Sequence, residues 1–200
     1  MTKPLRVALF VGHKGPGTGA QDDPLTPYNE DEFDNAQKAA CAIGANLLLR
    51  HHQPLVITGE GDDYLVERVR LALKSRCDLA IGCHFNAVAD RRANGCEVLA
   101  HPADESSWAL ASVLANHIAQ RTGVELRHKG SFGTVEVGGL AVLSAMFKAK
   151  TPAAIIEPLF LSNEEDQQVL ASDGYWRDLA TAVCDAIDIW AAVWKVERHG

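Results

Sequence analysis

The stretch LRVALFVGHKGPGTG, residues 5–19, begins with an apolar run that only Arg6 interrupts and ends in a glycine-rich loop. A strand that is apolar on both faces is typical of a parallel sheet covered by helices on both sides. From residue 32 the pattern changes to helical spacing, with one apolar face formed by Phe33, Ala36, Ala40, Ile43 and Leu47. We therefore expect a buried first strand, a loop and then an amphipathic helix.

The same alternation of strands and helices continues along the chain. Apolar segments predict further strands at residues 55–58, 77–83, 97–100 and 153–156, and periodicity predicts helices from about 62, over 104–121 and over 174–196. Residues 123–139 are typical of a loop or short strands, and residues 140–147 fit either a strand or a short helix. This order predicts an α/β fold in a single domain, residues 1–200, with a twisted, mostly parallel or mixed sheet and helices on both faces.

Composition narrows the classes of function. The 200 residues include 19 basic and 26 acidic ones, a net charge of −7, and lack the basic clusters that nucleic-acid binding requires. No apolar stretch approaches the roughly 20 residues of a membrane-spanning helix. We therefore expect neither nucleic acid nor membrane insertion.

The N-terminal segment and the cysteines indicate the compartment. The first apolar run stops at Gly12 without the features of a secretory signal, so we expect synthesis in the cytoplasm without a signal peptide. The five cysteines are scattered and form no CxxC pair, which argues against a disulfide framework and a cysteine-rich zinc site. Reduced, buried thiols are the expectation.

Ionisable residues stand at the ends of three predicted strands. His13, His84 and Glu157 each follow an apolar run, and the carboxyl ends of strands line the ligand crevice of open α/β sheets. Glu32 begins the first helix and could face the same crevice. Two imidazoles and a carboxylate form a typical catalytic zinc site, beside which a further carboxylate can act as general base. Hydrolysis of an amide or ester is the reaction class that this set favours.

Simpler interpretations exist for the same residues. His13 could cap a turn, His84 could be a hydrogen-bonded core histidine, and Glu32 could complement the helix dipole. Glu157 follows a buried strand and therefore needs a partner. Glu30 and Asp31 compete with Glu32, whereas Cys83 points to the opposite side of its strand from His84 and is expected in the core. The other histidines are interpreted as surface or structural residues: His51, His52, His101, His117, His128 and His199.

Four segments together resemble a known family. They are FVGH with PGTGA (residues 10–20), EFD (32–34), GCHFNA (82–87) and PAAIIEPLFLSN (152–163). In this order they are similar to the motifs of the zinc-dependent N-acetylmuramoyl-L-alanine amidases of the amidase 3 family. The final helix fits as well, and Lys14 departs from the glycine that is common in the family.

The resemblance implies hydrolysis of the amide between the lactyl group of N-acetylmuramic acid and L-alanine in peptidoglycan. It implies that His13, Glu32 and His84 hold one Zn²⁺ ion and that Glu157 is the catalytic proton carrier. Asn86 receives no firm role. Tyr28 and Phe132 are candidates for apolar contacts with the substrate.

The setting follows from the same resemblance. A chain without a signal peptide or a wall-binding domain resembles the catalytic domain of a phage endolysin, which acts on the cell wall after release through a membrane lesion. A toxin delivered by a secretion machine would look the same, whereas an autolysin normally carries an export signal. We expect a monomer. Two alternatives remain: a zinc amidase or carboxypeptidase of the same scaffold on another amide, and a non-catalytic peptidoglycan-binding module.

Overall fold

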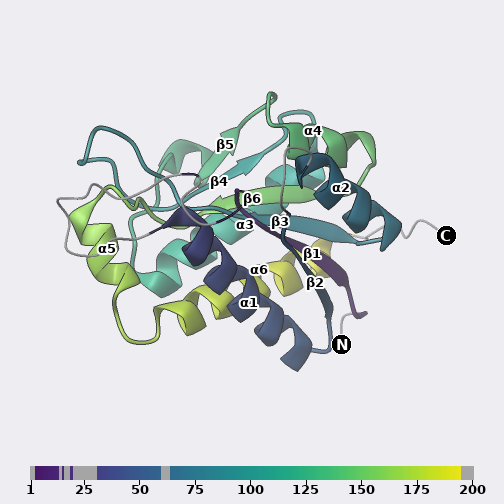
Figure 1. Ribbon diagram of the computed structural model, residues 1–200, viewed down its shortest axis with the longest axis horizontal. Coiled ribbons are helices and arrows are strands. Elements are labelled where there is room, and N and C mark those ends of the chain that lie inside the picture. The colour runs from purple at the N-terminus through teal and green to yellow at the C-terminus, as the bar shows by residue number, and fades with distance from the viewer. Residues whose placement is uncertain (1–2, 14, 16–18, 20–30, 60–63, 195–200) are drawn as a thin grey trace.

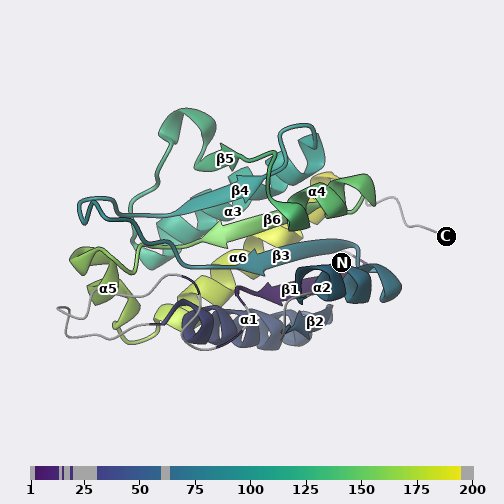
Figure 2. The same cartoon turned by 45° about the horizontal axis from the view of Figure 1, so that its top comes forward.

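In the computed structural model, which describes residues 3–13, 15, 19, 31–59 and 64–194, six strands form one sheet in the order β2-β1-β3-β6-β4-β5 (Figures 1 and 2). Strands β2, β1, β3 and β6 are parallel, β4 pairs antiparallel with β6, and β5 pairs parallel with β4. The α/β fold with a mixed sheet is therefore confirmed. The strands are β1 (Arg6–Val11), β2 (Gln53–Ile57), β3 (Leu79–Cys83), β4 (Glu97–Ala100), β5 (Thr134–Glu136) and β6 (Ala153–Glu157).

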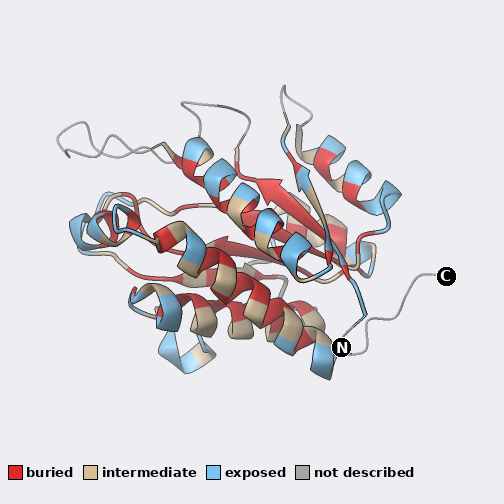
Figure 3. Ribbon diagram, turned by 90° about the horizontal axis from the view of Figure 1, so that it is seen from below, coloured by how far each residue is buried: buried red, intermediate tan, exposed pale blue. Residues whose placement is uncertain are grey.

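Helices cover both faces of the sheet. Alternate side chains of β1 point to opposite faces, so that Val7 and Leu9 pack in one core with α1, α3 and α6, whereas Ala8 and Phe10 pack in a second core with α2 and α4. Buried residues accordingly gather on the strands and on the inner faces of the helices (Figure 3). The helices are α1 (Glu32–Leu49), α2 (Tyr64–Lys74), α3 (Glu105–Thr122), α4 (Ala141–Lys148), α5 (Glu164–Leu170) and α6 (Tyr175–Val193).

Most predicted elements exist within a few residues of their expected bounds. The ambiguous segment 140–147 is helix α4, and the segment 123–139 contains a short 3₁₀ helix, η1 (Lys129–Ser131), followed by β5. Helix α5 was not predicted. Cys41 is exposed, which corrects the expectation of buried thiols, while the other four cysteines are buried. No described helix combines the length and apolarity needed to cross a bilayer.

Strand direction decides which segments meet at the site. The parallel strands β1, β3 and β6 end at one edge of the sheet. Because β4 runs antiparallel to β6, the first residue of β4, Glu97, lies opposite the last residue of β6, Glu157. Strand β5 is parallel to β4 and therefore also begins at this edge. Strand β2, parallel to β1, ends there too, so this edge contains the ends of four strands and the beginnings of two.

Candidate active site

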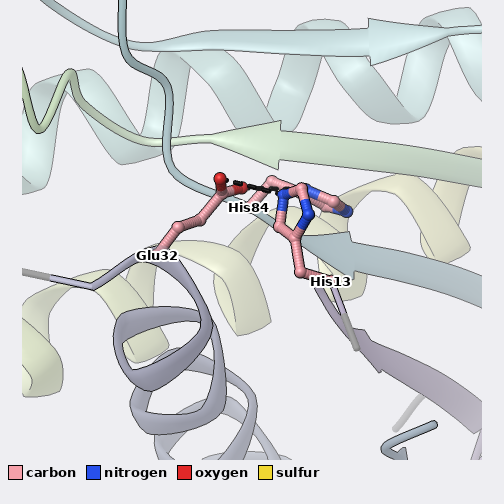
Figure 4. Close-up of side chains that lie close together, drawn as sticks. All are labelled: His13, Glu32 and His84. Carbon is pink, nitrogen blue, oxygen red and sulfur yellow. Dashed lines mark hydrogen bonds and ion pairs between the residues drawn. The ribbon is translucent and has the colours of Figure 1, made fainter. Parts of the chain in front are cut away.

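His13, Glu32 and His84 come together at this edge of the sheet (Figure 4). The Glu32 carboxylate lies between the two imidazoles, with Oε2 2.9 Å from His13 Nε2 and Oε1 3.0 Å from His84 Nδ1. The three donor atoms all lie within 4.8 Å of one another, and the imidazole rings are edge-to-face with centroids 5.1 Å apart. The group combines two imidazole nitrogens with one carboxylate, and it could hold a metal ion.

Local backbone structure brings the two histidines close together. His13 follows β1 in a left-handed conformation, with φ of 57°, and its carbonyl oxygen accepts a hydrogen bond from the buried Arg68 guanidinium. A Cβ atom at Gly12 would lie 2.9 Å from His84 Nδ1, and one at Gly19 would lie 2.4 Å from His13 Cδ2. The glycines therefore allow the loop backbone to approach both rings.

Glu32, and not its neighbour Asp31, contacts the histidines. Asp31 is the N-cap of α1, where its side chain accepts hydrogen bonds from the backbone N–H groups of Phe33, at 2.8 Å, and Asp34, at 3.3 Å. Glu32 is 3% exposed and also accepts a hydrogen bond from the Phe85 backbone at 3.2 Å. Its burial between two imidazoles goes beyond what a helix-dipole role requires. The other residues considered at this end, Lys14, Tyr28 and Glu30, lie outside the described residues.

Glu157 is the last residue of β6, whereas the sequence predicted that the strand ends at residue 156 and that Glu157 follows it. Its Oε2 atom is buried and has no hydrogen-bond partner among the described residues. Burial raises the pKa of this carboxyl group well above its ordinary value, and the negative charges of Glu32 and Glu97 raise it further. A carboxyl group with a raised pKa is suited to accept a proton and to release it again during a reaction.

Sequence reasoning missed Glu97, which faces the site beside Glu157. Its carboxylate accepts hydrogen bonds from Asn86 Nδ2 at 2.8 Å and from Arg127 Nε at 2.9 Å, and it contacts His128 Nε2 at 3.0 Å. Asn86, for which no firm role was predicted, thus contacts Glu97. Glu97 lies at the start of a strand, and a search confined to strand ends overlooks it.

Arg68 was also missed, although the sequence contains a signal for it. It stands three residues after Leu65 and four before Ala72, and therefore on the inward face predicted for this helix. A charged residue on an apolar helix face needs a specific partner. Here that partner includes the His13 carbonyl oxygen.

Other histidines have structural environments. The buried His52 accepts a hydrogen bond from the Leu5 backbone at Nδ1 and contacts Asp188 through Nε2 at 2.9 Å. His101 stacks on Phe147 with ring centroids 4.1 Å apart. Cys83 is fully buried in the core, as predicted. These residues take no part in the cluster of Figure 4.

The chain is similar in sequence to proteins of known family. Residues 7–188 match the model of the amidase 3 family, described as N-acetylmuramoyl-L-alanine amidase. The chain is 25% identical over 187 residues to the endolysin of Bacillus phage SPP1; the match covers 90% of this chain and 64% of the relative, so it spans just under two thirds of that protein.

Solved structures of similar fold are also known. The N-acetylmuramoyl-L-alanine amidase AmiC2 of Nostoc punctiforme is 26% identical, with a TM-score of 0.78 over 96% of this chain and 99% of that one. The N-acetylmuramoyl-L-alanine amidase of Clostridium difficile 630 is 24% identical, with a TM-score of 0.76 over 94% of this chain and 97% of that one, and supports the fold.

Proposed function

The chain belongs to the amidase 3 family of N-acetylmuramoyl-L-alanine amidases, and we propose that it hydrolyses the amide between N-acetylmuramic acid and L-alanine in peptidoglycan. One observation supports this assignment above the others. Two imidazole nitrogens and a buried carboxylate converge at the sheet edge where Glu157 presents a second buried carboxyl group. This pairing of a three-donor cluster with a separate acid is what metal-assisted amide hydrolysis requires.

We assign one zinc ion to His13, Glu32 and His84. Catalytic zinc sites typically have three protein ligands drawn from histidine and carboxylate side chains, and they leave a further position open. The two imidazoles, about a quarter to a third exposed, meet Glu32 from the solvent side, while the Glu32 carboxylate is buried. Bound zinc supplies Lewis-acid polarisation of the amide carbonyl and lowers the pKa of the attacking water.

Glu157 has the role of proton carrier. Its carboxylate takes a proton from the attacking water as the carbon–oxygen bond forms, and it delivers that proton to the alanine nitrogen as the carbon–nitrogen bond breaks. The products are a free lactyl carboxylate on the sugar and a free alanine amino group on the peptide. The buried, unpartnered Oε2 atom and the raised pKa of Glu157 support this assignment.

The biological setting that we propose is lysis of the bacterial cell wall. The likeness to a phage endolysin supports synthesis in the cytoplasm followed by action on peptidoglycan after release or delivery by another system. The proposed active unit is a monomer formed by residues 1–200. Peptidoglycan fragments with an intact muramoyl peptide are the substrate.

Digestion of purified peptidoglycan tests this proposal. The zinc-loaded protein is expected to release new alanine amino termini without new reducing sugar ends, and a chelator should abolish the release. Glu157→Gln is the matched control, because it keeps the shape of the side chain and removes the proton carrier. New termini from a residue other than alanine would indicate a different amide substrate, and no cleavage at all by zinc-loaded protein would favour a binding module.

A further inference from the structure

A short loop, residues 128–133, lies at the edge of the sheet that holds the proposed catalytic residues. It precedes β5, which begins at this edge because β5 is parallel to β4 and β4 is antiparallel to β6. We call it the His128 loop. Its position follows from strand direction alone, since the residues before β5 and the residues after β3 and β6 must lie at the same end of the sheet.

The His128 imidazole is attached to the site through Glu97. Its Nε2 atom lies 3.0 Å from Glu97 Oε2, and Glu97 lies opposite Glu157 across the β4–β6 pair. The Glu97 side chain is only 12% exposed, whereas the His128 side chain is 45% exposed. A carboxylate at the sheet edge therefore holds one ring nitrogen of an imidazole that is partly exposed to solvent.

The backbone of the loop is held in place around this contact. The His128 carbonyl oxygen accepts hydrogen bonds from the backbone N–H groups of Ser131, at 2.8 Å, and Gly133, at 3.2 Å. The Ser131 hydroxyl donates to the Thr134 carbonyl oxygen at 2.7 Å. His128 and Phe132 are both left-handed, with φ of 46° and 54°. Such conformations are unfavourable for residues other than glycine and cluster at functional sites.

Charge pairing explains how His128 is oriented. Arg127 donates to the same Glu97 oxygen at 2.9 Å, and its guanidinium lies over the Phe160 ring at 4.6 Å from the centroid. Because Glu97 Oε2 already accepts a hydrogen bond from Arg127, we assign the donor role in the contact with His128 to the imidazole Nε2 atom. In the neutral imidazole the Nδ1 atom is then an acceptor.

We propose that His128 is a substrate-binding residue whose Nδ1 atom accepts a hydrogen bond from an amide N–H group of the muramoyl peptide, with Glu97 as the positioning residue. This inference rests on the proposed function, because it names a contact of the same substrate beside Glu157. An N-acetyl group and the peptide amides all provide the required donor. Within this loop, only the His128 side chain is assigned a contact with the substrate.

Binding measurements in the Glu157→Gln background separate this contact from catalysis. The ligand is an N-acetylmuramoyl dipeptide, and its Kd is measured by calorimetry for that parent protein and for added His128→Gly and His128→Gln. His128→Gly removes the imidazole and relieves the left-handed backbone, so the fold is expected to remain at least as stable. We expect about 5- to 10-fold weaker binding, the loss of one hydrogen bond. His128→Gln retains a donor for Glu97 and an acceptor for the ligand, and should recover most of the affinity.

Two controls make the result specific. Lys129→Ala changes the same loop at an exposed residue that pairs with Glu125, and it should leave Kd unchanged. In the unmutated loop, the ¹⁵N signals of the His128 ring should shift on ligand binding, whereas those of His101, which follows the opposite end of β4, should not. Equal Kd values for the parent and His128→Gly, or an unshifted His128 ring, would overturn the inference while leaving the amidase assignment intact. Failure of the parent to bind the dipeptide would overturn both.

Discussion

Among the single residues, Glu157 has features that favour catalysis but lower the stability of the fold. Burial of the Glu157 carboxyl group, whose Oε2 atom has no hydrogen-bond partner among the described residues, disfavours its ionised form, and two neighbouring carboxylates disfavour it further. Proteins retain such groups at functional sites at the expense of stability. The proposed role of Glu157 therefore makes a prediction about stability as well as about activity.

Glu157→Gln should stabilise the metal-free protein at neutral pH. The raised pKa means that the folded chain keeps its Glu157 proton after the unfolded chain has released it, so stability decreases as the pH rises above the ordinary glutamate value. The variant lacks this decrease. Its Tm should exceed that of the wild type at pH 7, and the difference should vanish at a pH well below the ordinary value. A Tm difference that stays constant across this range would contradict the assigned burial.

Arg68 is expected to act on metal binding through the backbone of His13. Arg68→Met keeps an apolar stem of similar length but loses the donor to the His13 carbonyl oxygen. Removal of a side chain that hydrogen-bonds to a metal ligand typically weakens metal binding by roughly 10- to 100-fold. We expect a weakening of this size in zinc competition with a chelator. Arg70→Met, on the same helix but paired with Glu67 at the surface, is the matched control and should bind zinc normally.

The sequence alone identifies the site residues that lie at the ends of strands, but it neither decides between Glu32 and Asp31 nor identifies Glu97. His13 and His84 follow apolar strands, and Glu157 ends one, so their convergence was predictable from the direction of parallel strands. The choice of Glu32 over Asp31 needed the resemblance to a family, since both stand at the start of a helix. Glu97 could not be predicted, because its position depends on an antiparallel pairing that periodicity does not reveal.

Among the helices and strands, the short helix α5 connects the segment before β4 with the segment after β6, and these strands carry Glu97 and Glu157. Asp166, buried on this helix, accepts hydrogen bonds through one oxygen from the backbone N–H groups of Gly95 and Phe160, each at 2.8 Å. Gly95 lies just before Glu97, and Phe160 lies just after Glu157. The placement of both glutamates thus depends on one side chain of α5.

Replacement of Asp166 tests this dependence. Asp166→Ala leaves two buried N–H groups without an acceptor, which should lower the free energy of unfolding by about 2 to 4 kcal/mol. Asp166→Asn keeps an acceptor oxygen at the same place and should lose much less. Urea unfolding of both variants measures the difference. Equal stability of the alanine variant and the wild type would show that the two loops do not depend on this residue.

Length and periodicity explain which elements were predictable. Helices α1, α3 and α6 have 18 or 19 residues and a regular apolar face, and they were predicted closely. Helix α5 has seven residues with three acidic ones in its first turn, and β5 has three residues. Such short elements contain too few apolar positions for a period to be recognised, and contacts with other segments determine them.

At the scale of the whole molecule, the mixed sheet concentrates the chemistry at one edge. The parallel strands β1, β3 and β6 bring His13, His84 and Glu157 to that edge, and the reversed strands β4 and β5 bring Glu97 and the His128 loop to it. A sheet with all strands parallel would place the start of β4 at the opposite end. The mixed topology therefore adds a polar wall that the parallel part alone lacks.

The proposed mechanism divides the roles between two sets of residues: His13, Glu32 and His84 hold zinc, and Glu157 transfers the proton. The most direct test measures zinc content and muramoyl-L-alanine hydrolysis together for Glu157→Gln and His84→Ala. Glu157→Gln should keep one zinc ion per chain while its hydrolysis rate decreases by roughly 10²- to 10⁴-fold, whereas His84→Ala should lose both zinc and activity. A Glu157→Gln protein that hydrolyses the amide at the wild-type rate, or that no longer binds zinc, would contradict the account.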